Sequence, residues 1–262
     1  MDQGGITILA HDRRAAILKL LAEDKSVLVR ELSKKLDVTA ETIRKDLSIL
    51  ESEGKLIKTH GGAFIRDGVK NDIDIRIRET FYLDAKEKIG KKCSEIINDG
   101  DTILLDASTT SFQIAKNLVN KKKITVLTNS LKVAGELSNY SNIKLVLLGG
   151  ILDHSSLSLL GYDTEEMLER YFVDKAFVSC RGVSMEHGIT DSYELQAIIR
   201  RLMFNKGQKK YLVIDSTKFD VVAFSLIGDF SIIDAVVVDE FANDKWIDFL
   251  ESRNIKIIKA ND

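Results

Sequence analysis

Hydrophobic residues recur every three or four positions in three stretches near the start of the chain. This spacing places them on one face of an α-helix, so it predicts three amphipathic helices within residues 13–53. The apolar positions are Ile17, Leu20 and Leu21 in the first helix, Val29, Leu32 and Leu36 in the second, and Ile43, Leu47 and Leu50 in the third.

The third helix has signals at both of its ends. The hydroxyl of Thr39 can satisfy free N–H groups of a first turn, and Gly54 is suited to ending the helix. Residues 55–59 predict a short strand, and residues 60–62 predict a tight turn. Polar residues lie off the apolar stripe, so one face of this helix can pack while another contacts DNA, with the following hairpin as a wing. These polar residues are Thr42, Arg44, Lys45 and Ser48.

Residues 67–83 predict a linker between two domains. Residues 67–74 contain Gly68 and Asn71 and keep no regular period, and a chain without proline has nothing to stiffen such a segment. We therefore expect domains at residues 1–66 and 84–262, the second opening with a helix from about residue 84 to residue 98.

Beyond residue 100 the chain alternates short apolar runs with helix-like segments. This order is typical of an α/β fold with a mainly parallel sheet flanked by helices. The expected strands are 102–105, 124–127, 144–148, 175–178, 211–214, 235–238 and 255–258, and the expected helices are 111–120, 130–138, 164–171, 193–205 and 243–252.

Composition supports a globular protein with two cores. The 262 residues are 44% hydrophobic, enough for a small domain and a mid-sized one. No run approaches the ~18 apolar residues of a membrane span, and the first residues lack the order of a secretory signal, so we expect a cytoplasmic protein. We expect Cys93 and Cys180 to be structural, and we expect no cofactor and no metal.

Net charge argues weakly about partners. The whole chain carries −2, but residues 1–66 hold 12 Lys and Arg against 10 Asp and Glu, which is +2, and the remaining 26 against 30 give −4. Affinity for DNA would therefore depend on where the cations lie, and dimerisation would help.

Small polar residues follow several expected strands. In parallel sheets ligands bind beyond the carboxyl ends of the strands, where helix N-termini offer N–H groups and suit phosphates. The candidates are Asp106, Ser108, Thr109 and Thr110 after the first strand, Thr128, Asn129 and Ser130 after the second, Gly149 and Gly150 after the third, and Asp215 with Lys218 after a later one. Any one of these fragments is more often a helix N-cap than a ligand site.

Five stretches in the first 66 residues carry a family resemblance. They are Arg13-x-x-x-Ile17, Val29-x-Glu31-Leu32, Thr42-Ile43-Arg44-x-Asp46-Leu47, Leu50-Glu51 and His60-Gly61-Gly62-Ala63. Together they resemble the N-terminal winged helix-turn-helix of the DeoR-type family of bacterial transcriptional regulators.

The resemblance continues through the rest of the chain. Matching stretches include Asp99-Gly100-Asp101-Thr102, Asp106-x-x-Thr109-Thr110, Thr128-Asn129-Ser130, Gly149-Gly150 and Asp215-Ser216-x-Lys218-Phe219. They resemble the family's C-terminal sensor domain, which looks like ribose-5-phosphate isomerase in fold and surrounds a phosphorylated sugar. The family commonly has glycine at the position of Ser108, so the resemblance implies a different effector or weaker binding here.

The resemblance implies a repressor of a sugar-metabolism operon that binds operator DNA and responds to a sugar phosphate. It also implies a homodimer or homotetramer. The DNA-binding residues would be Thr39, Thr42, Arg44, Lys45, Ser48, Lys58 and His60, and the effector-binding residues would be the strand-end candidates above.

Other interpretations stay open from sequence alone. Arg44 could form a structural ion pair with Glu41 or Asp46 instead of reading a base. The chain could also be an isomerase-like enzyme that uses Asp106, Asp215 and Lys218 as acid-base groups, or a non-specific DNA-coating protein. We favour the regulator without catalytic residues, because it uses both domains.

Overall fold

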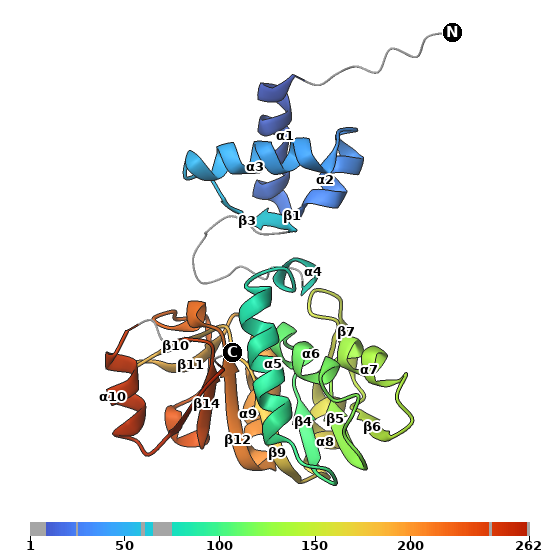
Figure 1. Cartoon of the computed structure of the whole chain (residues 1–262), viewed down its shortest axis with the longest axis vertical. Coiled ribbons are helices and arrows are strands. Elements are labelled where there is room, and N and C mark those ends of the chain that lie inside the picture. The colour runs from blue at the N-terminus through green and yellow to red at the C-terminus, as the bar shows by residue number, and fades with distance from the viewer. Residues whose placement is uncertain (1–8, 25, 59–60, 65–74, 241–242, 261–262) are drawn as a thin grey trace. The chain divides into compact units, whose positions relative to one another are not determined.

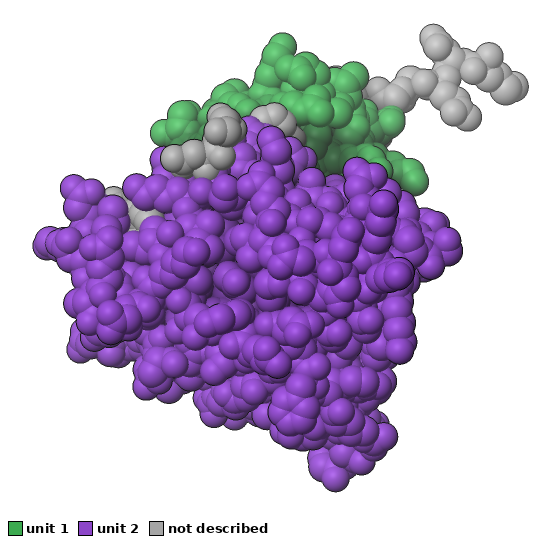
Figure 2. Space-filling view, turned by 60° about the horizontal axis from the view of Figure 1, so that its bottom comes forward, with its two compact units in different colours: residues 1–81 green, residues 82–262 purple. Residues whose placement is uncertain are grey.

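The computed structural model describes residues 9–24, 26–58, 61–64, 75–240 and 243–260. The chain divides into two compact units, Met1–Phe81 and Tyr82–Asp262, which Figure 2 colours separately. No helix among the described residues is long and apolar enough to span a membrane.

Unit 1 contains the three helices that the apolar spacing predicts. They are α1 (Ala10–Asp24), α2 (Val29–Lys35) and α3 (Ala40–Ser52), and the short helix α4 (Ile75–Arg78) follows later. Ile17, Ile43 and Leu47 have no exposed surface, so the predicted stripes of α1 and α3 meet in one core.

A small antiparallel sheet completes unit 1. Strands β1 (Ser26–Leu28), β3 (Gly62–Phe64) and β2 (Ile57–Lys58) pair in the order β1-β3-β2. The expected hairpin is confirmed in β2 and β3, whereas β1 was not predicted because three residues cannot display a period. A Cβ on Gly62 would lie 2.1 Å from the carbonyl oxygen of Val27, so this strand pairing needs glycine there.

A seven-stranded parallel sheet forms the centre of unit 2 (Figure 1). Its order is β15 (Lys256–Lys259), β14 (Ala235–Val238), β12 (Gly207–Ile214), β9 (Val173–Val178), β4 (Thr102–Leu105), β5 (Ile124–Thr128) and β6 (Ile143–Leu147). Each of the seven predicted apolar runs is one of these strands. Every neighbouring pair is parallel, so all seven carboxyl ends lie at one edge.

Helices cover both faces of this sheet, as predicted. α5 (Leu83–Ile96), α6 (Thr109–Lys116) and α7 (Leu131–Leu137) contribute to one core, and α8 (Tyr162–Glu169), α9 (Glu194–Lys206) and α10 (Lys245–Glu251) contribute to the other. Leu104 points into one core while Ile103 and Leu105 point into the other, which explains why β4 is apolar throughout.

Five short strands of unit 2 were not predicted. The hairpin of β7 (Ile151–Asp153) and β8 (Ser158–Leu160) follows β6. A separate antiparallel sheet contains β10 (Gly182–Ser184), β11 (Gly188–Asp191) and β13 (Ser225–Gly228). Two 3-10 helices flank β13 in the sequence: η1 (Ser216–Lys218) lies between β12 and β13, and η2 (Phe230–Ile232) lies between β13 and β14. Strands of three or four residues are too short for a periodic signal.

The sheet order places a switch point between β4 and β9. The chain runs outward from β4 through β5 to β6, then returns to the other side of β4 and runs outward again from β9. A crevice forms outside the carboxyl ends at such a point, because the connections leave in opposite directions.

Candidate functional site

The start of α3 is capped as its sequence predicts. Thr39 has an extended backbone, and its hydroxyl oxygen accepts a hydrogen bond from the Thr42 backbone N–H at 3.1 Å. The two hydroxyl groups also lie 2.9 Å apart. Thr42 therefore has a fixed position at the first turn, beside the exposed side chains of Arg44 and Lys45.

Arg44 and Asp46 have different environments. Nη1 of Arg44 lies 3.4 Å from Glu41 Oε2, and both side chains are about half exposed or more, so this pair adds little stability. Asp46 is instead buried and accepts from Arg13 Nε at 2.5 Å. Of the two structural pairs considered for Arg44, the one with Glu41 exists, and Asp46 joins α3 to α1.

The strand after α3 is tied to the exposed face of that helix. The Lys58 ammonium donates to Ser48 Oγ at 2.6 Å, and the Lys58 backbone N–H donates to Glu51 Oε1 at 2.8 Å. Ser48 also donates to the Arg44 carbonyl oxygen at 2.9 Å. Hydrogen bonds thus link Lys58, Ser48 and Arg44, and Lys45 is exposed on the same helix, whereas His60 lies outside the described residues.

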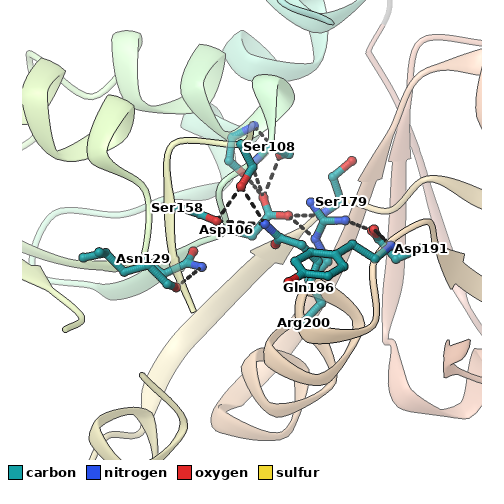
Figure 3. Close-up of polar contacts among 12 residues, drawn as sticks. Asp106, Ser108, Asn129, Ser158, Ser179, Asp191, Gln196 and Arg200 are labelled. Carbon is teal, nitrogen blue, oxygen red and sulfur yellow. Dashed lines mark hydrogen bonds and ion pairs between the residues drawn. The ribbon is translucent and has the colours of Figure 1, made fainter. Parts of the chain in front are cut away.

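In unit 2, Asp106 is the centre of a buried hydrogen-bond cluster at the switch point (Figure 3). Its Oδ1 accepts from the Ser108 hydroxyl at 2.6 Å and from the Ser111 hydroxyl at 2.5 Å. Its Oδ2 accepts from the Ser179 backbone N–H at 3.1 Å and from Arg200 Nε at 2.9 Å. This carboxylate therefore joins the end of β4 to the end of β9.

Sequence reasoning missed Arg200 and two of its neighbours. Arg200 of α9 also pairs with Asp191, at the end of β11, and both side chains are buried. One turn earlier on α9, Gln196 donates to Ser156 Oγ at 2.9 Å and to Ser158 Oγ at 2.8 Å. The signal was the i, i+4 spacing of Gln196 and Arg200, which places two polar residues on one helix face.

The first turn of α6 offers free donors beside this cluster. Ser108 is the N-cap, and its Oγ accepts from the Ser111 N–H at 3.0 Å. The hydroxyl groups of Thr109 and Thr110 make no hydrogen bond to any part of the chain that the structure describes. Ser108 has φ −86°, so the backbone here does not require the glycine that the family commonly has.

Thr128, Asn129 and Ser130 connect β5 to α7. The Ser130 hydroxyl caps α7 by accepting from the Val133 N–H at 3.2 Å, and Thr128 Oγ1 accepts from the Ser130 N–H at 3.1 Å. Asn129 donates from Nδ2 to the Leu159 carbonyl oxygen at 3.0 Å. Helix capping thus accounts for Ser130, which is the more common role of a polar residue after a strand.

The two glycines after β6 differ. Gly150 has φ +136°, and a Cβ there would lie 2.1 Å from Thr164 Oγ1, so the close approach of α8 requires glycine. A Cβ on Gly149 would meet no atom within 4 Å. Packing therefore explains Gly150, and only Gly149 borders open space.

Asp215 and Lys218 form a partly buried pair after β12. Lys218 Nζ lies 3.5 Å from Asp215 Oδ2, and the Thr217 hydroxyl and N–H both donate to Oδ1. Burial alone would raise the pKa of Asp215, but the charges of Lys218 and Lys86 and the hydrogen bonds from Thr217 outweigh it, so the pKa lies below its ordinary value.

Charges around the switch point balance. Asp106, Asp191 and Asp215 face Arg200, Lys218 and Lys86, which gives three carboxylates and three cations. Because these cations already pair with carboxylates, an anion that binds here also needs the uncharged hydroxyl donors of α6. The Lys218 side chain is 22% exposed, so it is the cation of this group that a ligand can reach most easily.

Both cysteines are buried and free. Burial raises the pKa of Cys180 to about 12, and burial likewise raises the pKa of Cys93. Because the reactive thiolate is disfavoured, both behave as packing residues. Within the described ranges, no group of three His, Cys, Asp or Glu side chains could hold a metal.

Comparison with known protein families covers both units. A family model of the DeoR-like helix-turn-helix domain matches residues 13–68, and one of the DeoR C-terminal sensor domain matches residues 82–240. The chain belongs to the DeoR family of transcriptional regulators. As a member of that family it is a DNA-binding regulator whose C-terminal unit is a sensor domain.

Curated DeoR-family relatives resemble the chain over most of its length. The HTH-type transcriptional regulator YulB of Bacillus subtilis is 36% identical over 95% of this chain and 96% of its own. The lactose phosphotransferase system repressor of Lactococcus lactis is 36% identical over 79% of this chain and 82% of its own.

Solved structures resemble the chain more distantly. Ribose 5-phosphate isomerase A from Methanocaldococcus jannaschii is 17% identical and has a TM-score of 0.39, covering 52% of this chain and 54% of that one. The family assignment therefore depends on the sequence matches and not on this likeness.

Proposed function

We propose that the protein is a repressor of sugar-metabolism genes that releases its operator when a phosphorylated sugar binds at the strand ends of unit 2. The observation that carries this proposal is the first turn of α6, where Thr109 and Thr110 offer unused hydroxyl donors at the switch point. A phosphate suits such a helix start, because free N–H groups and the helix dipole both favour an anion.

On the DNA side, the exposed face of α3 is the proposed recognition surface. Thr42, Arg44, Lys45 and Ser48 would enter the major groove, while Thr39, Lys58 and His60 would contact the backbone. Support comes from exposure, because Arg44 and Lys45 point to solvent and the Arg44–Glu41 pair is easily broken.

On the effector side, each strand end has a proposed role. Thr109, Thr110 and Lys218 would bind the phosphate, Ser108 and Asp106 would hold the α6 turn in place, and Asp215 would orient Lys218. Thr128, Asn129, Ser130, Gly149 and Gly150 would form the other wall. Asp106 suits an orienting role, because both of its oxygens already accept two or more hydrogen bonds.

Two parts of this proposal, the link to sugar metabolism and the choice of repression over activation, are taken from a relative. The lactose phosphotransferase system repressor shares 36% identity, and its name joins a sugar to repression. We extend both to this chain, together with a homodimer or homotetramer that would place two α3 helices on one operator.

An isomerase function is the second candidate, and two observations weigh against it. Neither oxygen of Asp106 is free to take a proton from a substrate, and the lowered pKa of Asp215 makes it a poor base near neutral pH. Incubation with pentose and hexose phosphates should therefore give no turnover.

The experiment begins with DNA that the protein selects from a random-sequence pool. Ribose 5-phosphate, glucose 6-phosphate and other phosphates are then screened by thermal shift, where a ligand at 100 times its Kd stabilises by about 2.7 kcal/mol. A binder should weaken operator affinity ~5- to 150-fold, the range of a typical coupling.

Two variants test the effector site directly. Thr109→Ala and Lys218→Ala should bind the selected DNA like the parent, but the ligand should not change that binding. Size-exclusion chromatography of the parent with and without DNA measures the proposed oligomeric state. A parent-like ligand response in both variants, or loss of DNA binding in a folded variant, would contradict this site.

A further inference from the structure

The segment that leads into β13 and forms it is apolar on both of its faces. Ala223 and Ile227 are buried, whereas Val222, Phe224 and Leu226 at the alternate positions are 43%, 60% and 52% exposed. Alternate residues of an extended segment point to the same side, so these three side chains form one apolar surface, here called the β13 strip. A face that meets water normally carries polar residues, so this strip indicates that another surface covers it.

A hollow of about 750 Å³ adjoins the β13 strip, and Leu226 lines it. The hollow lies between the turn that joins β10 to β11 and the region around α10. Its other apolar lining residues are Met185, Phe230, Ile233, Phe249 and Ile255. The protruding Phe224 is thus two residues along the chain from the edge of a hollow that suits an apolar side chain.

The charged residues of the hollow argue against a phosphate or a nucleic acid as its occupant. Glu186 and Asp229 are acidic, Arg253 is the cation that opposes them, and all three are exposed. The Arg253 guanidinium also lies 3.7 Å from the centre of the Phe249 ring, which places its charge against an aromatic face. An apolar centre surrounded by exposed charges of both signs is typical of a surface that binds another protein.

A partner at β13 would meet side chains rather than add a strand. The edge of a sheet can pair with a strand of another protein through its free backbone groups. Here Arg201 of α9 donates from Nε to the Ile227 carbonyl oxygen and from Nη2 to the Leu226 carbonyl oxygen, both at 2.6 Å. These two carbonyl oxygens are already paired, so association at this surface depends on the β13 strip and the hollow.

The apolar area is of the size that a protein interface needs. A whole aromatic side chain presents about 150–250 Å², so Phe224, Val222 and Leu226 at their observed exposures present on the order of 250 Å² together. A standard interface buries about 800 Å² per partner, of which about 450 Å² is apolar. The β13 strip therefore supplies about half of that apolar area, and the lining of the hollow adds to it.

We propose that the β13 strip and the hollow form the surface that binds a second copy of this chain, with Phe224 of each copy in the hollow of the other. A two-fold interface must be self-complementary, and a protruding side chain beside a hollow meets that condition with one kind of surface. The inference rests on the homo-oligomer of the proposed function, and it adds the residues that assemble that oligomer.

Substitutions of two exposed phenylalanines test this surface in the full chain. Phe224→Glu places a charge on the β13 strip, and Phe172→Glu is the matched control, because Phe172 is 77% exposed and does not line the hollow. Sedimentation equilibrium measures self-association, and circular dichroism checks that both variants are folded. We expect Phe224→Glu to weaken self-association at least about thirtyfold, as loss of a central aromatic anchor does, and Phe172→Glu to change it less than about twofold.

A mixing experiment tests the position of Phe224 in the hollow. Ser231 is exposed and lines the hollow, so Ser231→Trp should fill it and, like Phe224→Ala, weaken self-association. In a mixed pair, the Ser231→Trp copy supplies Phe224 and the Phe224→Ala copy supplies an open hollow. An equimolar mixture should therefore associate about tenfold more tightly than either variant alone.

Each contrary result has a distinct meaning. A parent that stays monomeric at every concentration tested would overturn the inference together with the proposed oligomer. A parent that assembles, with equal association in Phe224→Glu and Phe172→Glu, would overturn only the inference, and a mixture no tighter than its components would do the same. Release of the selected DNA by a phosphate ester is measured on the parent alone, so the proposed regulation is tested separately.

Discussion

The two candidate sites are built in opposite ways. The α3 surface consists of exposed side chains on one short stretch of sequence, and a packed stripe on the other face of the helix holds them in place. The strand-end site consists of buried groups from distant stretches that bond to one another, as with Asp106, Ser179 and Arg200. Apart from the N-cap Thr39, substitutions at the first site should therefore change affinity with little effect on stability, whereas substitutions at the second should change stability as well.

The sharpest test of this difference is Arg200→Met. Removing the cation leaves Asp106 and Asp191 buried without their partner, and breaking a buried ion pair in this way costs about 3–5 kcal/mol. Urea unfolding followed by circular dichroism measures the loss. Arg170→Met is the matched control, because Arg170 pairs with Glu166 on an exposed face and should change stability by less than about 0.5 kcal/mol. Similar losses of unfolding free energy in both variants would contradict the expected difference between the buried and the exposed ion pair.

The second test is Arg44→Ala. If Arg44 reads a guanine, the variant should lose about 1–3 kcal/mol of discrimination between operator and random DNA, with parent-like unfolding because its pair with Glu41 is exposed. Fluorescence anisotropy on both DNA types provides the ratio. Lys58→Ala is the comparison, since a lost phosphate contact weakens both DNA types equally. A proportional loss for Arg44→Ala would argue against base reading.

Thr39→Ala should have a smaller effect on the first site. The Thr39 hydroxyl caps α3, and removal of such a cap costs about 1 kcal/mol. The loss should appear in the thermal unfolding of unit 1 and weaken all DNA sequences alike, because the whole helix loosens. A variant with parent-like stability and altered sequence preference would instead make Thr39 a reading residue.

Ser108→Gly should have the smallest effect. The N-cap hydroxyl and its bond to Asp106 are lost, yet glycine is itself an acceptable N-cap and Asp106 keeps its bonds from Ser111, Ser179 and Arg200, so we expect a loss below about 1 kcal/mol. Phosphate binding measured by calorimetry should stay within about twofold of the parent. A large gain in affinity would show that the serine, and not the ligand class, limits binding.

The parts of the fold that could be predicted are those with a local signal. Parallel strands buried on both faces are continuously apolar, so β4, β5 and β14 were evident from sequence. The hairpin of β7 and β8 was not, because its three-residue strands are defined by partners and not by a period.

The same division holds within the strand-end site. The position of Thr109 after a strand predicts its place at the sheet edge, because parallel topology fixes it. Arg200 lies 94 residues from Asp106, and although its i, i+4 spacing places it on the same face of α9 as Gln196, the spacing does not show that this face turns inward. Its pairing depends on the tertiary structure, which brings α9 to the residue that follows β4.

The sheet order also determines when each unit can complete its fold during translation. Asp215 and Lys218 follow β12, which pairs with β9 on the side away from β4, so the strand-end site is incomplete until residues 207–218 have left the ribosome. The core of unit 1 needs only residues from the first quarter of the chain, and domains generally fold as units with the N-terminal one first. A nascent chain should therefore complete its helix-turn-helix unit well over a hundred residues before its sensor unit, and a product truncated between them would carry the DNA-binding unit without the sensor.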